Sequence, residues 1–415
     1  MFSTRQTRPL LPHARTLFTR RKPAGPIRST ITTTLTITGL VLGGYYLSDS
    51  RAGFYTHIAM PVLRATTDAE TSHSLAIRAL SMGLTARDTA TLSQEEAERL
   101  GFSLWGRDFE SPIGLAAGLD KQAEGIDGLF NLGFSYVEVG SVTPQPQPGN
   151  PKPRYFRLPK DNAVINRYGF NSEGHANVAA RLAARGDRKT PGKVLALNLG
   201  KNKNGDEVSD YVRGVEKLGP YADVLVINVS SPNTPGLRTL QHGDALSSLL
   251  GAVRKARDTH PNKHVQGVPL LVKIAPDLST EELAGIAQIL VKQEIDGCIV
   301  SNTTLARPSS LQHQDVAQEA GGLSGAPLKP MTMQALKTLK SHLRQQQAGD
   351  KVRLIACGGI SSGQDVLDYF DAGASFVQAY TAFGYEGPRF PRRIREELFS
   401  LLKARNTTVS ELIAR

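Results

Sequence analysis

The stretch VLVINVSSPNTPGL, residues 224–237, decides the fold and indicates where a site should lie. Its first part, VLVIN, is a short run of β-branched and apolar residues, which is typical of a buried strand. The run then meets Pro232 and Pro235, which have no backbone N–H to donate, so the chain leaves the sheet in a stiffened loop. Polar side chains gather at this strand end: Asn228, Ser230, Ser231, Asn233 and Thr234. By itself, the stretch also fits an ordinary polar turn.

Further β-rich runs of this kind follow one another from residue 112 to residue 380, each succeeded by a helical pattern. In order, the runs are PIGLAA, SYVEVG, KVLALN, DVLVIN, PLLVKI, GCIVSN, RLIACG and SFVQAY. Alternating strands and helices over about 290 residues predict an α/β protein with a (β/α)8 TIM barrel, which we assign to residues 101–405. An open doubly wound sheet is the alternative. No GxGxxG opens the first unit, however, and eight near-equivalent units favour closure.

Polar or small residues stand where each run stops, and the strand ends of a barrel open on one face. These residues are Gly118 with Asp120 and Lys121, Ser141, Asn198, Asn228 with Ser231, Lys273, Ser301 with Asn302, Gly358 with Gly359, and Tyr380 with Thr381. We therefore predict an active site on this face. The irregular stretches 144–153 and 307–322 are expected to be loops over it, as lids or as surface decoration.

Two features predict a phosphate-bearing, redox-active ligand. Gly358 and Gly359, with the turn at Tyr380 and Thr381, offer backbone N–H groups where TIM barrels usually bind phosphate. Lys273 stands in the apolar run LLVKI, where a charge is costly unless an anion pairs with it. That anion is either a structural carboxylate or a reduced flavin, whose N1 and O2 region becomes negative.

The loop 228–237 contains no His, Glu or Asp that could act as a conventional base. Ser231 is a poor base alone, but its hydroxyl can relay a proton when it is linked to Thr234 or to water. Lys121 adds a cation suited to a carboxylate. Amide groups, each both donor and acceptor, are supplied by Asn166, Asn171, Asn233 and Asn302. Together these groups suit a small, planar, acidic, imide-like substrate.

The N-terminus carries much of the net charge of +11. Seven basic residues lie between Arg5 and Arg28, and no acidic residue occurs before Asp49. A basic, Ser- and Thr-rich leader without acids is typical of a mitochondrial targeting segment, which we assign to residues 1–30, with a plain disordered tail as the alternative. This distribution argues against a nucleic-acid partner.

An uncharged segment, ITTTLTITGLVLGGYYL, follows at residues 31–47 and is a candidate for a single transmembrane helix. Its five threonines weaken the signal, and a removed signal sequence or a buried helix is the rival interpretation. Because the basic residues precede the segment, the body of the protein would face the intermembrane space.

Residues 54–100 have a helical pattern with two predicted capping boxes, Thr67 with Glu70 and Ser93 with Glu96. The middle helix is more apolar than one core-facing stripe requires, which fits either ordinary packing or a membrane-facing platform. Cys298 and Cys357 each lie in an apolar run, so we expect buried thiols and neither a disulfide nor a metal site.

Ten ordered motifs between about residue 54 and residue 387 closely resemble the membrane-bound, quinone-linked (class 2) dihydroorotate dehydrogenases of mitochondria. The motifs are AAGLDK, GSVTP, INRYGFNSEG, LNLGKNK, INVSSPNTPGLR, VKIAPD, SNTT, GGLSG, ACGGISSGQD and VQAYTA. The resemblance implies a flavin mononucleotide (FMN) enzyme that oxidises (S)-dihydroorotate to orotate for pyrimidine synthesis. It also implies ubiquinone as acceptor, in the inner mitochondrial membrane. No metal or nucleic acid is implied, and a monomer is expected.

By position in these motifs, Ser231 would take the C5 proton, with Thr234 as relay, while a hydride passes from C6 to the flavin. Substrate contacts are implied for Lys121, Asn166, Arg167, Tyr168, Gly169, Phe170, Asn228, Asn233, Asn302 and Thr303. Flavin contacts are implied for Ala117, Gly118, Ser141, Asn198, Asn228, Lys273, Ser301, Gly325, Gly359, Tyr380 and Thr381. In the family, an N-terminal helical pair forms a quinone tunnel, here within residues 54–100, with His57, Arg157 and Tyr380 as its polar contacts.

Two other functions remain open on the sequence. A soluble-type FMN oxidoreductase of dihydroorotate or a dihydropyrimidine, using fumarate or NAD, is the enzymatic alternative. The soluble relatives use cysteine as the base, whereas the loop here has Ser231, and this difference disfavours them. A membrane-tethered binding barrel without turnover is the non-enzymatic alternative.

Overall fold

The computed structural model describes residues 26–186, 188, 190–312 and 314–415 of the 415-residue chain. Most of the predicted targeting segment, residues 1–25, therefore lies outside the described residues. The chain divides after Tyr46 into a short N-terminal unit and a large unit that contains every strand of the described residues.

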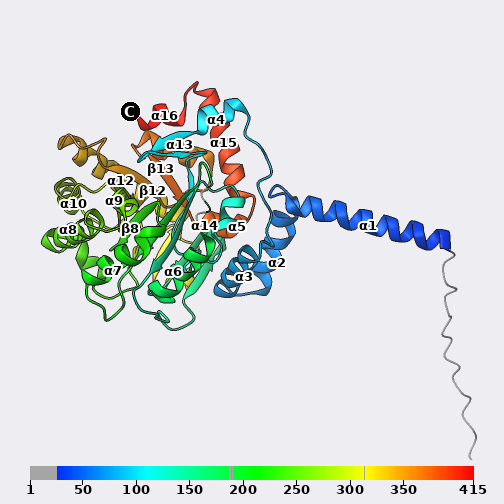
Figure 1. Cartoon of the computed structure of the whole chain (residues 1–415), viewed down its shortest axis with the longest axis horizontal. Helices are drawn as coiled ribbons and strands as arrows, with labels where there is room; N and C mark the ends of the chain where they lie inside the picture. Colours follow the sequence, from blue (N-terminus) through cyan, green and yellow to red (C-terminus); the bar gives the residue numbers. More distant parts are fainter. Residues whose placement is uncertain (1–25, 187, 189, 313) are drawn as a thin grey trace, which may run out of the picture. The chain divides into compact units, whose positions relative to one another are not determined.

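Eight parallel strands, all within the described residues, close into a barrel in sequence order (Figure 1). They are β3 (Ile113–Leu115), β4 (Tyr136–Val142), β7 (Val194–Leu199), β8 (Val224–Asn228), β9 (Leu270–Ile274), β10 (Gly297–Val300), β12 (Arg353–Cys357) and β13 (Phe376–Ala379). The pairing of β13 with β3, at Val377 and Ile113, closes the ring. The predicted barrel is thus confirmed, and each predicted run forms one strand. The open sheet is excluded.

Helices cover the outside of the barrel (Figure 1), so most strands are buried on both faces and read as continuous apolar runs. The helices of the repeating units are α5 (Ile126–Asn131), α6 (Gly174–Arg185), α7 (Ser209–Leu218), α8 (Gly243–Asp258), α10 (Thr280–Lys292), α12 (Lys329–Gln345), α13 (Gly363–Asp371) and α15 (Phe390–Ala404). Shorter helices are α9 (Lys263–Gln266), α11 (Gln314–Ala317), α14 (Thr381–Glu386) and α16 (Val409–Ile413).

A second, antiparallel sheet combines two insertions of the barrel. It is formed by β5 (Tyr155–Leu158), β6 (Ala163–Asn166) and β11 (Gly322–Gly325), in the order β11-β6-β5. Residues 307–322, expected to be a loop, instead contain α11 and lead into β11. Apolar side chains of these insertions form a small core of their own: Leu158, Ala163, Ile165, Leu311, Ala317 and Leu323. Because each strand has only four residues, sequence periodicity did not reveal the sheet.

The N-terminal helical region of the large unit contains a π-helical turn (Tyr55–Ala59), α2 (Met60–Thr66), α3 (Ala69–Ser81) and α4 (Gln94–Leu100). A hairpin of β1 (Phe102–Leu104) and β2 (Arg107–Phe109) follows. The capping box of Ser93 and Glu96 is confirmed. The box of Thr67 and Glu70 is wrong, because the Asp68 carboxylate caps α3 and Glu70 pairs with Arg154 instead.

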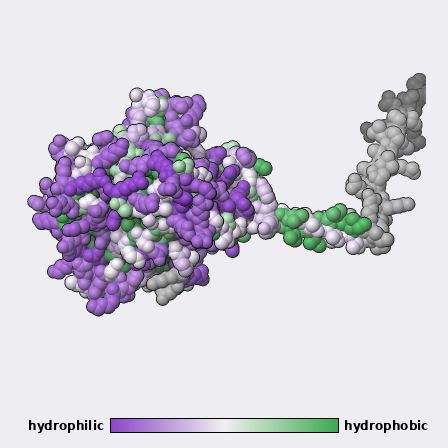
Figure 2. Space-filling view, turned by 90° about the horizontal axis from the view of Figure 1, so that it is seen from above, coloured by the Kyte–Doolittle hydropathy of each residue, from purple (hydrophilic) through white to green (hydrophobic). Residues whose placement is uncertain are grey.

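The segment 31–47 lies in helix α1 (Pro26–Ser48), so its helical conformation is as expected. Across the part of the chain that the structure describes, however, no helix combines the length and apolar character needed to cross a membrane. The predicted transmembrane helix is therefore not supported, because five threonines and three glycines dilute the apolar residues of 31–47. Figure 2 shows hydrophobic residues along α1 and a mostly hydrophilic surface on the visible face of the large unit.

Candidate active site

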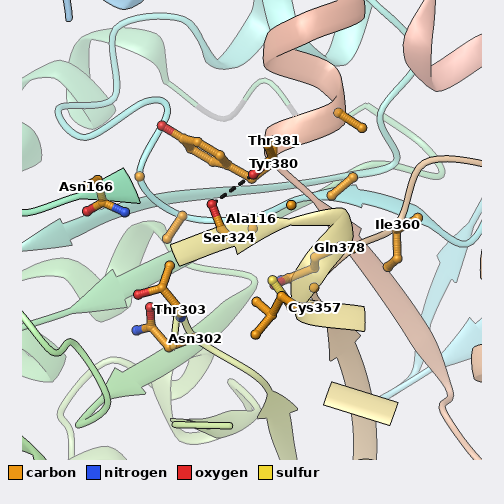
Figure 3. A pocket seen from close by; sticks show the side chains of 18 of the residues that line it. Ala116, Asn166, Asn302, Thr303, Ser324, Cys357, Ile360, Gln378, Tyr380 and Thr381 are labelled. Atoms are coloured by element: carbon orange, nitrogen blue, oxygen red, sulfur yellow. Dashed lines mark hydrogen bonds between the residues drawn. The ribbon is translucent and has the colours of Figure 1, made fainter. Parts of the chain in front are cut away.

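A cavity of about 620 Å³ opens at the carboxyl ends of the barrel strands and contains most of the predicted site residues. Predicted substrate residues in its lining are Lys121, Asn166, Tyr168, Gly169, Phe170, Asn228, Asn233, Asn302 and Thr303, together with Ser231. Predicted flavin residues in its lining are Ala117, Gly118, Ser141, Lys273, Ser301, Gly325, Gly359, Tyr380 and Thr381. Figure 3 shows Asn166, Asn302 and Thr303 on one side of the pocket, Ile360 on the other, and Cys357 and Gln378 between them.

The loop after β8 is held in place by a hydrogen bond within the loop and by another to the end of β6. Gly236 adopts a φ of +73°, a left-handed conformation that glycine reaches without strain, and lets the loop turn into a short helical segment. Ser231 is only 7% exposed, and its Oγ accepts the backbone N–H of Asn233 at 3.3 Å. The side chain of Asn233 donates to Oδ1 of Asn166 at 3.2 Å. The loop therefore presents Ser231 to the cavity from a fixed backbone.

Lys121 approaches the cavity from the loop after β3. Its Nζ donates to the Gly118 carbonyl at 2.7 Å and lies 3.9 Å from the centre of the Tyr168 ring. Burial, aided by the positive charge of Arg154, lowers the pKa of Lys121 to about 7. A carboxylate bound beside this amine would favour its charged form.

The base of the cavity contains a buried charge pair. Nζ of Lys273 lies 3.9 Å from Oε1 of Glu138, which is 0% exposed. Burial acts to lower the pKa of Lys273, but Cys357 and the Glu138 carboxylate outweigh it, so the pKa is raised and the ammonium persists. Of the two predicted partners for Lys273, the structural carboxylate is therefore present. Sequence reasoning missed Glu138, although it too interrupts an apolar run, YVEVG.

Glycines and hydroxyls line the end of the cavity near β12 and β13. Gly325 and Gly359 have φ of +103° and +68°, and a Cβ at Gly325 would lie 2.2 Å from a backbone oxygen. Ser324 and Thr381 share a hydrogen bond of 2.9 Å, drawn in Figure 3. Positions 325 and 359 both require glycine, because neighbouring protein atoms occupy the space that a side chain would fill and the backbone has a positive φ.

A second cavity, of about 360 Å³, lies between the helices α2 and α3 and the barrel. Its lining is mainly apolar, and it shares Arg64, Tyr380, Thr381 and Tyr385 with the first cavity. The Tyr155 and Tyr380 hydroxyls are 3.5 Å apart. An elongated apolar ligand could therefore approach the polar cavity through the helical region.

Comparison with known proteins identifies the family. The family model described as dihydroorotate dehydrogenase matches residues 99–402. The chain belongs to the dihydroorotate dehydrogenase family. A Schizosaccharomyces pombe relative, named dihydroorotate dehydrogenase (quinone), mitochondrial, is 48% identical over 87% of this chain and 86% of its own. A Mus musculus relative of the same name is 46% identical over 90% and 93%.

A solved Eimeria tenella structure, titled as DHODH in complex with ferulenol, has a TM-score of 0.77 and 40% identity. It covers 83% of this chain and 95% of its own. As a member of the dihydroorotate dehydrogenase family, the chain is an oxidoreductase of dihydroorotate in pyrimidine biosynthesis, and the family uses a flavin.

Several predicted residues of this dihydroorotate dehydrogenase do not line the first cavity. Asn198 is buried beside it and bonds to Ser141 and Glu138. Arg167 turns away to pair with Glu319. Thr234 is buried, and its Oγ1 has no hydrogen-bond partner in the described part of the chain.

The predicted quinone contacts are divided. Tyr380 and Arg157 line the second cavity, but exposed His57 lines neither of the two cavities, whereas its neighbour Thr56 lines the first. Arg157 also donates to the Thr67 carbonyl at 2.9 Å, at the end of α2. Sequence reasoning missed His73, whose Nε2 lies 2.6 Å from the Leu119 carbonyl in the second cavity. No distinctive sequence motif surrounds it.

Within the described residues, no cluster of three or more His, Cys, Asp or Glu side chains is arranged to hold a metal. Cys298 and Cys357 are both buried free thiols, as predicted. Burial raises the pKa of Cys357, which lines the first cavity beside Lys273.

Proposed function

We propose that the chain oxidises (S)-dihydroorotate to orotate with FMN and transfers the electrons to ubiquinone, in the de novo synthesis of UMP. The observation that carries this proposal is the junction of the two cavities. A polar cavity lined by amides and Lys121 suits the acidic pyrimidine, and the adjoining apolar cavity suits a quinone. The names of the relatives support the acceptor.

The charge and the lining residues of the first cavity support FMN as its ligand. The residues proposed to hold it are Ala117, Gly118, Ser141, Asn198, Asn228, Lys273, Ser301, Gly325, Gly359, Tyr380 and Thr381. Gly325 and Gly359 line the cavity with backbone of positive φ, whose N–H groups would bind the phosphate, and Lys273 offers a cation to the ring. Oε1 of Gln378 and Oγ1 of Thr303 are buried in its lining, and neither has a hydrogen-bond partner within the described ranges. Bound FMN would supply reversible acceptance of two electrons from the substrate.

The protein's own groups would bind the substrate and move its proton. The carboxylate would be held by Lys121, and the pyrimidine edge by the amides of Asn166, Asn228, Asn233 and Asn302, with Arg167, Tyr168, Gly169, Phe170 and Thr303 completing the proposed substrate set. Ser231 would accept the proton from C5 as its own hydroxyl proton leaves toward Thr234 or water. Thr234, whose Oγ1 is free of partners among the described residues, would pass it on through water. Ser231 is buried, so this transfer would take place away from bulk water.

The second cavity would bind ubiquinone, within a quinone-access domain of residues 54–100 that lies before the FMN-binding barrel of residues 101–405. Arg157 and Tyr380 are the proposed polar contacts, and the exposed position of His57 weakens its role. This cavity favours quinone over fumarate or NAD, because its mainly apolar lining has few groups to bind a charged acceptor.

The relatives are named mitochondrial, and we propose that the chain resides at the inner mitochondrial membrane with its body facing the intermembrane space. Residues 1–30 would direct import. We propose a monomer in contact with membrane lipid. Protease treatment of mitochondria whose outer membrane has been ruptured, but whose inner membrane is intact, tests the orientation. We expect the protease to digest the body of the protein. Protection of the body would contradict the proposed orientation.

One experiment separates the candidate functions. Purified enzyme is mixed anaerobically with dihydroorotate, flavin absorbance is followed, and decylubiquinone is then added. We expect loss of absorbance at about 450 nm and recovery on quinone addition. If the flavin absorbance does not fall, dihydroorotate is excluded as the substrate. If it falls and is restored by fumarate or NAD but not by decylubiquinone, quinone is excluded as the acceptor.

A further inference from the structure

A continuous hydrogen-bonded chain connects the buried Glu138 to the amides that line the first cavity. Nδ2 of Asn198 donates to Oε1 of Glu138 at 2.6 Å. Ser141 donates to Oδ1 of Asn198, and Nδ2 of Asn228 donates to Oγ of Ser141 at 2.9 Å. Oδ1 of Asn228 accepts Nδ2 of Asn302 at 3.2 Å. The chain thus runs from strand β4 to Asn302, the second residue after β10.

The Glu138 carboxylate determines which group donates in each hydrogen bond of this chain, because an ionised carboxylate only accepts hydrogen bonds. Its two oxygens receive Nδ2 of Asn198, Nε2 of Gln378 at 2.5 Å and the Tyr136 hydroxyl at 3.3 Å. Asn198 must then turn its oxygen to Ser141. That hydroxyl donates to Asn198 and accepts from Asn228, so the sense passes along the chain.

The consequence for ligand recognition lies at the far end of the chain. Nδ2 of Asn302 is committed to Asn228 and to Oγ of Ser230, at 3.2 and 3.0 Å. Oδ1 of Asn302 already accepts the backbone N–H of Thr303 at 2.8 Å. Its second lone pair is therefore the hydrogen-bonding capacity that Asn302 retains toward the cavity, and this lone pair accepts an N–H. Gln378 behaves similarly: its nitrogen binds Glu138, and its oxygen has no partner in the part of the chain described.

We propose that Glu138 is a positioning residue, which sets the donor and acceptor sense of Asn228, Asn302 and Gln378 toward the ligands. This role rests on the proposed function, because it assigns the amides to dihydroorotate and the flavin. The same carboxylate holds Lys273 at 3.9 Å. One buried carboxylate would therefore determine which way the amides point and would also offset the positive charge of Lys273 beside the proposed flavin.

Glu138→Gln tests this role, because the substitution keeps the shape but introduces a donor. The amide nitrogen of the new glutamine would face the amide nitrogen of Asn198 or of Gln378. Two donors cannot bond to each other, so that asparagine or glutamine must turn its oxygen toward residue 138. We expect the Kd for orotate to rise roughly tenfold or more, and the flavin midpoint potential to become more positive, since a negative charge beside Lys273 is lost. Both are measured on purified holoenzyme, by calorimetry and by dye-linked titration.

Tyr136→Phe is the matched control, because it removes a neighbouring hydrogen bond to Glu138 but retains the carboxylate. Its Kd for orotate should lie within about twofold of the parent value, and its flavin midpoint potential within about a few millivolts. Equal values in Glu138→Gln and the parent would overturn the positioning role. If the parent itself binds no orotate and is not reduced by dihydroorotate, the proposed function fails instead.

A neutron crystal structure of the parent holoenzyme covers the case in which Glu138→Gln does not fold. Deuterium positions should show Nδ2 of Asn198 donating to the Glu138 carboxylate. The amide nitrogens of Asn228 and Asn302 should donate along the chain in the same sense. Reversal of any of the three amides, or a protonated Glu138, would overturn the proposal without reference to activity.

Discussion

Ser231 carries the proposed proton transfer without a histidine or carboxylate in its loop. Its Oγ is buried and held by the Asn233 N–H, so its position is set by backbone geometry. We expect Ser231→Ala to bind flavin normally but to slow anaerobic reduction by dihydroorotate roughly a hundredfold or more. Stopped-flow absorbance measures this rate. The remote variant Ser247→Ala, on α8, should match the parent, and an unchanged rate in Ser231→Ala would refute the assignment.

Lys121 makes substrate binding depend on pH. Its pKa, lowered to about 7 by burial, means that the free protein carries an ammonium below about pH 7 and an amine above it. A carboxylate ligand binds the ammonium, so above pH 7 binding must take up a proton, and affinity for orotate should fall up to about tenfold per pH unit.

Calorimetry of orotate binding between about pH 6 and pH 8.5, in buffers of different ionisation enthalpy, measures both the affinity and the proton uptake. The variant Lys121→Met should bind more weakly at pH 6 and lose the dependence. A pH slope that persists in Lys121→Met would place the titrating group elsewhere.

At the scale of elements, His73 fastens α3 to the barrel. Because Nε2 donates to the Leu119 carbonyl at 2.6 Å, Nδ1 is the acceptor for the Tyr168 hydroxyl at 3.2 Å. Burial lowers the pKa of His73 to about 3. Between about pH 6.5 and 3 the unfolded chain therefore binds one more proton here than the folded chain, so stability falls as pH falls through this window.

We expect His73→Gln, which can keep the bond to Leu119, to take up one proton fewer than the parent on unfolding below about pH 6.5. Its free energy of unfolding should therefore depend less steeply on pH. Melting followed by circular dichroism from pH 8 to pH 5 measures this. His260→Gln, on the surface between α8 and α9, provides the control. A slope in His73→Gln equal to that of the parent would show that His73 does not titrate on unfolding.

The barrel was predictable from sequence because most of its strands are buried on both faces and are followed by polar or small residues at the same edge. The position of the site was predictable for the same reason. Asn228, Lys273 and Tyr380 lie in or directly after the strands of VLVIN, LLVKI and SFVQAY, and all three line the same cavity. Contacts between distant segments were not predictable. Neither the partnership of Glu138 with Lys273 nor the docking of His73 against Leu119 leaves a local signal, since each depends on the closed ring or on helix packing.

At the scale of the whole molecule, the chain divides after Tyr46, and the cavities lie within residues 47–415. The large unit has its own core and holds all the residues proposed for catalysis. We therefore expect residues 47–415 to bind flavin and reduce decylubiquinone in detergent at the rate of residues 31–415. Their melting temperatures should agree within about 2 °C, because the described core residues of the large unit all lie beyond Tyr46.

The two chains should differ only at a membrane. Both lack the basic leader, so the comparison isolates residues 31–46, whose apolar side chains would enter lipid. Co-sedimentation with phosphatidylcholine vesicles containing cardiolipin should retain more of the longer chain. Equal retention would show that the exposed apolar residues of the helical region, such as Val62, Leu75 and Leu84, suffice for attachment. Loss of flavin or of quinone reduction in residues 47–415 would instead show that the first unit supports the site.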